Sequence, residues 1–306
     1  MEPRTKSNTS ISSFKEFSNS YKPIFETYLQ KTLSFPMNDA RKILNESMIY
    51  SSINKGKRVR PLLAMASSLL FSDSTKTILP FCTALELIHT YSLIHDDLPA
   101  MDNDELRRGQ PTNHVKYGED MAILAGDCLL TFAFEILASN LHNFFPPDTV
   151  LKSISYTAKE SGILGMIGGQ VLDIKHSGSQ NKNELHQIHK LKTGALIKTA
   201  VIVPALLHQA KPSEISLLEQ FGKSIGLLFQ IVDDILDVTQ TSSTLGKTPM
   251  KDIEQEKTTY ITIYGLEESK LIAKKEAQNA QDILEQLPYA TDYLKLFIDF
   301  FRSRTS

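Results

Sequence analysis

Two short segments of the sequence carry several aspartates each among apolar neighbours. The segment 93–109 contains Asp96, Asp97, Asp102, Asp104 and Glu105, and the segment 229–239 contains Asp233, Asp234 and Asp237. Carboxylates this close repel one another, and apolar surroundings add a desolvation cost to each charge. A cation between them removes both costs, and hard divalent ions such as Mg²⁺ prefer oxygen ligands. The two segments therefore predict a magnesium site.

The spacing of the aspartates limits how each segment can present them. Asp233 and Asp237 are four residues apart, so they share one face of a helix. Asp96 and Asp102 are six residues apart, and a straight helix would place them on different faces. Pro99 lies between them and interrupts the helical hydrogen bonds. We therefore expect the chain to turn at Pro99 and to bring Asp102 back toward Asp96.

Basic residues could bind the phosphates that carboxylate-bound Mg²⁺ usually shares with a substrate. Lys57 and Arg60 lie in GKRVRP (56–61), at the start of an apolar run. The other candidates are Arg107, Arg108, Lys192, Lys247 and Lys257. Each of these cations alone is typical of a solvated surface. Together they predict two phosphate pockets, one bridged by metal and one held by Lys and Arg alone.

Helices must position these residues, because the dominant hydrophobic periodicity of the sequence is helical. Segments 62–71, 121–141 and 224–238 are apolar and rich in Leu and Ala. They are too apolar for surface helices and too short to span a bilayer, so we expect them inside a large core. Segment 267–287 is amphipathic. With no repeat and no strand-like alternation, we predict a single all-α domain over residues 1–306.

The composition argues against several partners and compartments. The 33 Lys and Arg residues against 35 Asp and Glu give a net charge of −2, whereas a nucleic-acid binder needs a basic surplus. Cys82 and Cys128 are too few for a disulfide framework or a zinc cluster, which fits a reducing cytosol. The polar N-terminus lacks the apolar core of a signal peptide, so we expect a cytoplasmic protein without a membrane span. The long polar stretch 239–257 is typical of a lid.

Several motifs together resemble the short-chain trans-prenyl diphosphate synthases, and among them most closely the bacterial farnesyl diphosphate synthases. These motifs are GKRVRP, HTYSLIHDDLPAMDNDELRRGQPTNH, GGQVLD, HKLKTGALI, and FQIVDDILDVT with LGK after it. The resemblance implies a helical isoprenoid-synthase fold around a deep central cavity, and a homodimer. It also implies ionisation of an allylic diphosphate, attack by the double bond of isopentenyl diphosphate and loss of a proton. Three Mg²⁺ ions would neutralise the leaving diphosphate.

The same resemblance implies a role for each residue that matches a family motif. The implied Mg²⁺ ligands are Asp96, Asp97, Asp102 and Asp233, and Asp234 and Asp237 complete the second motif. The implied contacts of the allylic diphosphate are Arg107, Lys192 and Lys257, with Lys247 as a further substrate contact. The implied contacts of isopentenyl diphosphate are Lys57, Arg60, His89 and Arg108. Residues that would face the developing carbocation or line the same cavity are Thr193, Gln230, Gln170 and Asp173.

The product length should depend on what blocks the cavity below the metals. Tyr91 lies five residues before Asp96, which is about 7.5 Å along a helix, and Ser92 is beside it. A ring at that depth would stop the growing tail, and the Pro-Ala insertion in the first motif resembles the fifteen-carbon synthases. We therefore predict synthesis of (E,E)-farnesyl diphosphate from dimethylallyl and geranyl diphosphate. A geranylgeranyl diphosphate synthase of the same family is the alternative.

Three other interpretations account for fewer of the motifs. An HD-type metal phosphohydrolase would use His89, His95 and Asp96, but it leaves DDILD, GKRVRP and GGQVLD unexplained. A class I terpene cyclase would share the first aspartate motif, but it would carry an Asn/Ser/Glu-type second motif and needs no second diphosphate pocket. A regulatory subunit of a heteromeric synthase would be expected to have lost aspartates that this chain keeps.

Overall fold

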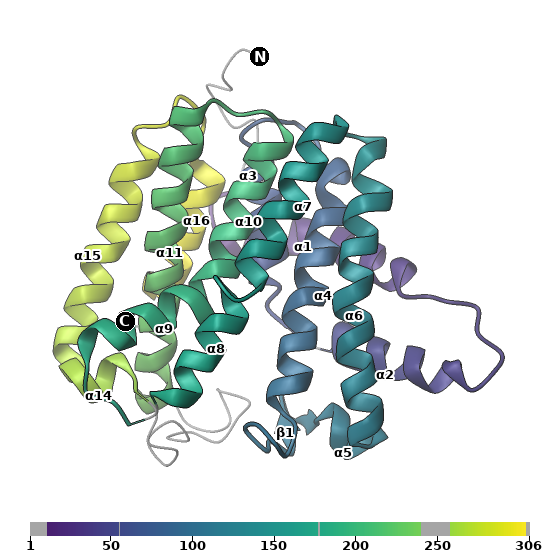
Figure 1. The fold of residues 1–306 in the computed structure, drawn as a ribbon. Coiled ribbons are helices and arrows are strands. Elements are labelled where there is room, and N and C mark those ends of the chain that lie inside the picture. Colours follow the sequence, from purple (N-terminus) through teal and green to yellow (C-terminus); the bar gives the residue numbers. More distant parts are fainter. Residues whose placement is uncertain (1–10, 55, 177, 240–257, 304–306) are drawn as a thin grey trace.

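The computed structural model describes residues 11–54, 56–176, 178–239 and 258–303 (Figure 1). The helices of the first half are α1 (Phe14–Thr32), α2 (Arg41–Ile53), α3 (Val59–Ser68), η1 (Lys76–Ile78), α4 (Leu79–Asp96), α5 (Asn113–Tyr117), α6 (Glu119–Asn140), η2 (Leu141–Asn143) and α7 (Pro147–Ser161). Those of the second half are α8 (Met166–Lys175), α9 (Lys182–Lys192), α10 (Gly194–Leu207), α11 (Pro212–Thr239), α14 (Tyr260–Tyr264), α15 (Leu266–Leu284) and α16 (Asp292–Ser303). A short antiparallel ribbon of β1 (Leu106–Arg107) and β2 (Gln110–Pro111) follows α4. The predicted all-α class is confirmed.

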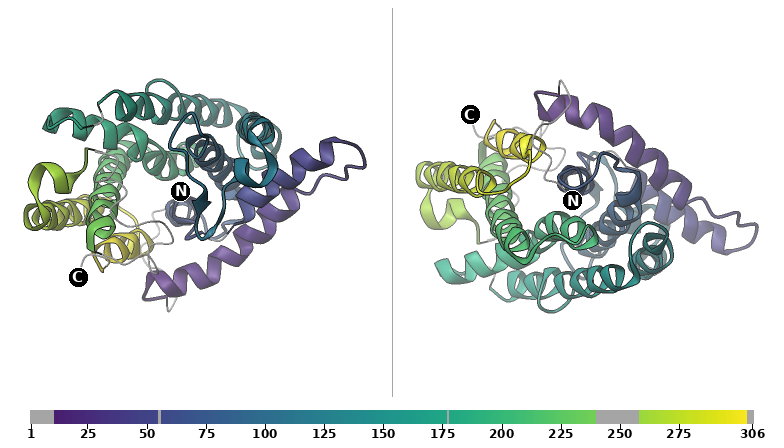
Figure 2. Two further views of the ribbon diagram at one scale, coloured as in Figure 1. Left: turned by 90° about the horizontal axis from the view of Figure 1, so that it is seen from below. Right: turned by 90° about the horizontal axis from the view of Figure 1, so that it is seen from above.

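The helices surround a central region of the molecule, as Figure 2 shows in views along their length. The pair α4 and α6 lies side by side, as do the pairs α10 and α11 and α11 and α15 (Figure 1). Within the bundle, α10 is buried on all its faces and contains few polar residues. A helix that is apolar all round is stable only when other helices cover it, which explains the inner position of α10.

Glycines allow α10 and α11 to approach each other closely. A Cβ atom added to Gly226 on α11 would lie 3.0 Å from the Cα atom of Gly194 on α10. This contact is tighter than ordinary van der Waals packing, so a larger residue at position 226 would push the two helices apart. Thr193 precedes Gly194 and Gln230 is one turn beyond Gly226. The close approach therefore brings two of the predicted site residues together.

The predicted helical segments and the predicted turn are confirmed. Segments 121–141, 224–238 and 267–287 correspond to α6, α11 and α15, and most of 62–71 falls in α3. The structure ends α4 at Asp96, three residues before Pro99. The predicted lid over 239–257 lies outside the described residues, apart from Thr239 at the end of α11.

The expectation that segments 121–141 and 224–238 are too short for a membrane is wrong, whereas segment 62–71 is buried in the core as predicted. Three helical stretches, Lys76–Asp96, Glu119–Asn143 and Pro212–Thr239, are long and apolar enough to cross one. The first is 78% buried by other helices over its most apolar window, and that burial accounts for its composition. In the stretch that contains α6, only 39% of the most apolar window is buried. Ile123 and Leu124 on this helix are 45% and 47% exposed. One apolar face of α6 is therefore open.

Candidate active site

The first aspartate motif lies at the end of α4 and in the turn that follows it. The backbone N–H of Asp102 donates a hydrogen bond to the carbonyl of Asp96 at 2.9 Å. This bond confirms that the chain turns back near Pro99 and brings Asp102 close to Asp96. Burial, opposed by the charge of Lys192 and reinforced by that of Asp102, raises the pKa of Asp96 to about 6. The negative charge of the Asp96 carboxylate is therefore unfavourable, and a bound cation would stabilise it.

Asp97, the second aspartate of this motif, is paired with Arg107. The Arg107 Nε–H group donates to both carboxylate oxygens at 2.9 Å, and Nη2 lies 2.6 Å from Oδ1. The Asp97 side chain is only 4% exposed. A two-pronged, charge-assisted contact of this kind holds both groups in one orientation. A metal ion bound to Asp97, as the sequence predicts, would therefore have to compete with the guanidinium.

The side chains of Arg107 and Arg108, in the hairpin of β1 and β2, extend in different directions. Its central residues, Arg108 and Gly109, have φ values of 55° and 75°, and two successive positive φ angles are the signature of a type I′ turn. Arg107 turns to Asp97, whereas the guanidinium of Arg108 lies against Gly56, where an added Cβ would be 2.7 Å from Nη1. The sequence did not reveal this turn, because the first central position holds Arg rather than Asn, Asp or Gly.

A second cluster of basic residues forms around the GKRVRP segment. Burial and the nearby charge of Arg108 lower the pKa of Arg60 to about 10. The Arg60 Nε–H is buried and has no hydrogen-bond partner among the described residues. Burial first, and then Arg60 and Arg108, hold the pKa of His89 well below its usual range, so the ring stays neutral at pH 7. Lys57 is exposed beside them. This cluster is suited to an anion with many oxygen acceptors.

Arg58, a buried neighbour of these residues, was not predicted from the sequence. Its Nη1 lies 2.6 Å from Glu86 Oε1, and Nη2 donates to the carbonyls of Ser52 and Asn54 at 2.8 and 3.2 Å. The Arg58 and Glu86 side chains are 1% and 5% exposed. Arg58 has a φ of 52°, a conformation that is unfavourable for a residue with a Cβ. Arg58 is the N-cap of α3, so the buried ion pair stabilises its strained backbone and fixes the junction between the loop that carries Lys57 and the helix start that carries Arg60.

Lys192 and the GGQ segment meet where α8 packs on the end of α9. Lys192 Nζ lies 2.5 Å from Asp173 Oδ2, and Asp173 together with Asp96 raises the pKa of Lys192 despite its burial. A Cβ added to Gly169 would lie 2.1 Å from the backbone nitrogen of Lys192. Only glycine therefore allows α8 to approach this closely. Gln170 follows Gly169 and is half-buried.

The second aspartate motif lies in the last turns of α11. Asp233 is half-buried, whereas Asp234 and Asp237 are 4% and 2% exposed. The charge of Asp233 opposes the lowering of the pKa of Arg60, so Asp233 lies near the GKRVRP segment. Although Asp233 and Asp237 are four residues apart, only Asp233 of the three aspartates is accessible enough to meet a ligand.

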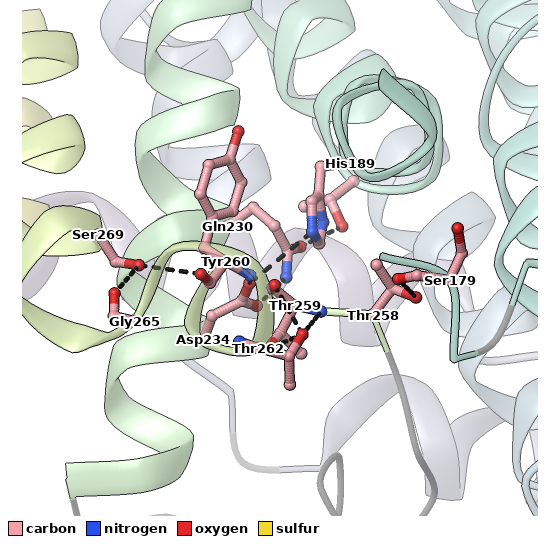
Figure 3. A network of polar contacts seen from close by, with 11 residues as sticks. Ser179, His189, Gln230, Asp234, Thr258, Thr259, Tyr260, Thr262, Gly265 and Ser269 are labelled. Carbon is pink, nitrogen blue, oxygen red and sulfur yellow. Dashed lines mark hydrogen bonds and ion pairs between the residues drawn. The ribbon is translucent and has the colours of Figure 1, made fainter. Parts of the chain in front are cut away.

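Asp234 belongs to a chain of hydrogen bonds that reaches the start of α14 (Figure 3). Thr193 Oγ1 donates to Gln230 Oε1 at 2.8 Å, and Gln230 Nε2 donates to Asp234 Oδ1 at 2.7 Å. The other oxygen of Asp234 accepts the backbone N–H of Tyr260 at 2.8 Å. His189 lies 3.7 Å from that oxygen, and burial lowers the pKa of His189 to about 3. Thr193 and Gln230, predicted to face the same cavity, are therefore in direct contact.

Two predicted lysines cannot be placed, whereas the structure describes Tyr91 and Ser92, the residues predicted to limit product length. Lys247 and Lys257 lie outside the described residues. Tyr91 is 5% exposed, and its hydroxyl is buried without a hydrogen-bond partner among the described residues. Ser92 is half-buried, and its hydroxyl donates to the carbonyl of His89 at 2.9 Å. Of these two residues, Tyr91 has the larger side chain and the more buried position.

The donor set of the site suits Mg²⁺ that is shared with a ligand. Within the described residues, no three Asp, Glu, His or Cys side chains converge closely enough to hold a metal ion by themselves. Mg²⁺ in proteins commonly takes one or two carboxylates and completes its shell with water and substrate phosphates. The carboxylates of Asp96, Asp102 and Asp233 fit this chemistry, and the burial that raises the pKa of Asp96 disfavours its negative charge unless a cation lies beside it.

Comparison with known proteins agrees with these observations. The family model described as polyprenyl synthetase matches residues 41–295. The large subunit 1 of the heterodimeric geranylgeranyl pyrophosphate synthase of Arabidopsis thaliana is 46% identical over 254 residues, 81% of this chain and 68% of that protein. The farnesyl diphosphate synthase of Micrococcus luteus is 40% identical over 281 residues, 92% of this chain and 96% of that protein.

Solved structures extend the agreement to the fold. The geranyltransferase of Helicobacter pylori, crystallised with magnesium and isoprenyl diphosphate, has a TM-score of 0.83 and 31% identity, with 96% of this chain and 98% of that chain covered. The FPP/GFPP synthase of Zymomonas mobilis has a TM-score of 0.82 and 32% identity, with 94% and 97% covered. The chain therefore belongs to the polyprenyl synthetase family, whose members are Mg²⁺-dependent prenyltransferases of isoprenoid biosynthesis.

Proposed function

We propose that the protein condenses isopentenyl diphosphate with dimethylallyl and then geranyl diphosphate to give (E,E)-farnesyl diphosphate. The observation that carries this proposal is the presence of two regions of charged side chains with different chemistry, one rich in carboxylates and one rich in arginine. One presents the carboxylates of Asp96 and Asp102 near Lys192 and Arg107, and the other presents Arg60 and Arg108 beside a neutral His89. Two diphosphates that must behave differently in one reaction need two such regions.

The region with the carboxylates would bind the allylic diphosphate, which must leave. Asp96, Asp102 and Asp233 would hold Mg²⁺, three ions by the family resemblance, and the metal would neutralise the negative charge of the departing diphosphate. Lys192 and Arg107 add two fixed positive charges, held in place by Asp173 and Asp97. Such charges, oriented before the reaction, stabilise a leaving anion without further reorganisation.

The arginine region would bind isopentenyl diphosphate, which must not ionise. Arg60 and Arg108 offer guanidinium groups that match phosphate oxygens, and Lys57 adds a third cation. His89 is neutral, so it can donate one hydrogen bond without adding charge. Binding without a metal ion leaves the C–O bond of this substrate less polarised than that of the allylic partner. The arrangement therefore selects which of the two diphosphates leaves.

Tyr91 is the residue that we propose limits the product to fifteen carbons. It lies at the depth where a longer tail would reach, and its ring is almost fully buried. Replacement of Tyr91 by Ala should shift the product toward twenty carbons, because it removes the ring from the path of the tail. Chromatographic sizing of the products measures the shift. Tyr91→Phe keeps the ring and loses only the hydroxyl, so it should retain the wild-type product length; an unchanged distribution in Tyr91→Ala would exclude this role.

A twenty-carbon product is the second candidate. The observation that favours it is the names of the relatives at 46% identity, which are geranylgeranyl pyrophosphate synthases. Farnesyl diphosphate as the allylic substrate separates the two candidates. A fifteen-carbon synthase extends geranyl diphosphate but leaves farnesyl diphosphate unchanged, whereas a twenty-carbon synthase extends both.

We also propose that the protein is a homodimer that buries the open apolar face of α6. Ile123 and Leu124 are exposed on a helix that is otherwise typical of a protein interior, and large apolar patches of this kind are common at subunit interfaces. Sedimentation of the wild-type protein at micromolar concentration should give the dimer mass. Leu124→Arg should give mostly monomer, whereas Leu271→Arg, at an equally exposed leucine on α15, should remain a dimer. A monomeric wild-type protein would contradict the proposal.

A further inference from the structure

The buried carboxylate of Asp234 accepts hydrogen bonds from two protein groups and is almost out of contact with solvent. Its Oδ1 accepts from the side-chain amide of Gln230 at 2.7 Å, and its Oδ2 accepts from the backbone N–H of Tyr260 at 2.8 Å (Figure 3). The residue is 4% exposed, and the ring of Tyr260 stacks on that of His189 with centroids 5.5 Å apart. Asp234 is thus enclosed by its own helix, by the start of α14 and by the end of α9.

The contact with Asp234 decides which way the amide of Gln230 faces. A side-chain amide has one group that donates and one that accepts, whereas a carboxylate only accepts. The NH₂ group of Gln230 must therefore face Asp234, and its carbonyl oxygen must face away. That oxygen lies 2.8 Å from the hydroxyl oxygen of Thr193. Since a carbonyl cannot donate, the single hydroxyl proton of Thr193 must point to Gln230.

We propose that Asp234 is a positioning residue that, through Gln230, holds the hydroxyl proton of Thr193 away from the reacting carbon. This inference rests on the proposed function and on the position that the family resemblance implies for Thr193 and Gln230, facing the developing carbocation. With its proton directed to Gln230, Thr193 turns its lone pairs toward the remaining directions, and lone pairs stabilise a positive charge. A hydroxyl proton turned toward the cation would repel it. Asp234 thus orients the hydroxyl group of Thr193, with its lone pairs toward the cation, before the substrate ionises.

Two variants test the direction of the hydrogen bonds. In Asp234→Asn, one carboxylate oxygen becomes an NH₂ group. The backbone N–H of Tyr260 cannot turn, so the remaining side-chain oxygen at position 234 stays with it and the new NH₂ faces Gln230. The Gln230 amide must then turn over and present its own NH₂ to Thr193. The double variant Asp234→Asn/Gln230→Glu exchanges the carboxylate and the amide. The carboxylate introduced at position 230 again accepts from Thr193, and every donor in the chain is again matched with an acceptor.

We expect kcat to fall about 10²-fold in Asp234→Asn, a loss typical of removing one pre-oriented polar group. The KM values of both substrates should stay within about threefold of wild type, since neither diphosphate is proposed to contact Asp234. The double variant should recover at least tenfold of that loss. A double variant no faster than Asp234→Asn, or an Asp234→Asn enzyme within twofold of wild type, would overturn the proposal. The first of these results would mean that the carboxylate itself is needed at position 234.

Thermal unfolding provides a second measurement that does not depend on turnover. The midpoint should be lower in Asp234→Asn, in which the hydroxyl proton of Thr193 loses its acceptor on Gln230, and should return toward wild type in the double variant. If the wild-type protein makes no condensation product, the proposed function fails while this cycle still tests the hydrogen-bond chain. If unfolding shows no coupling between the two substitutions, the inference fails, whatever the wild-type protein catalyses.

Discussion

Replacing Asp233 with alanine should lower kcat about 10³-fold while the protein remains folded. Asp233 is the only one of the three aspartates in the second motif that is not almost fully buried. We therefore expect it to be the motif's point of contact with Mg²⁺ and the leaving diphosphate. Loss of a metal ligand removes several kcal/mol of charge stabilisation, and about 4 kcal/mol corresponds to three powers of ten in rate. Steady-state rates at saturating Mg²⁺ measure the loss.

The matched control for Asp233→Ala is Asp299→Ala. Asp299 is an aspartate on α16 whose side chain is 60% exposed and whose ion pair, among the described residues, is with Arg302. Its removal should leave both the rate and the unfolding midpoint near the wild-type values, because exposed ion pairs contribute little. A rate for Asp233→Ala within tenfold of the Asp299→Ala rate would contradict a metal-binding role for Asp233.

Replacing Glu86 with alanine should lower the free energy of unfolding by about 3–5 kcal/mol. The substitution leaves the charge of Arg58 buried without the carboxylate that lies 2.6 Å from it, and an uncompensated buried charge is costly. Arg58 also holds a strained backbone angle that its contacts must stabilise. Urea denaturation followed by circular dichroism measures the change.

Glu26 provides the matched control for Glu86. It also contacts Arg58, at 3.5 Å, but its side chain is 42% exposed. Glu26→Ala should therefore cost less than about 1 kcal/mol. Folded Glu86→Ala protein should also show a raised KM for isopentenyl diphosphate, because Arg58 fixes the loop that carries Lys57 and the start of α3 that carries Arg60. Equal destabilisation by the two substitutions would show that the buried ion pair does not hold this loop.

The helical architecture could be predicted from the sequence because the spacing of apolar residues indicates which side chains of a helix are buried. The turn after α4 was also predictable, since proline interrupts the hydrogen bonds of a helix wherever it occurs. Periodicity does not report what covers a helix. The apolar segment that became α6 was expected in the core, yet the described chain leaves one of its faces open at Leu124. The sequence of one chain cannot distinguish a face covered by its own helices from a face available to another chain.

The candidate site was predictable as a set of residues but not as a set of contacts. Asp97 and Asp233 have the same side chain and lie in similar motifs, yet one is engaged by Arg107 and the other is half-buried and accessible. The difference arises from the hairpin turn at Arg108, which spacing alone does not reveal. Likewise, Glu86 lies in an apolar run ten residues before Asp96, and only the fold shows that it neutralises Arg58.

Condensation by the purified wild-type protein tests the proposed prenyl transfer most directly. The protein is incubated with Mg²⁺, isopentenyl diphosphate and an allylic diphosphate of five, ten or fifteen carbons, and the products are sized. We expect a fifteen-carbon diphosphate from the five- and ten-carbon substrates and no extension of the fifteen-carbon one. The reaction should stop when Mg²⁺ is chelated and resume when it is restored. The absence of a condensation product with all three allylic substrates would contradict the proposed function.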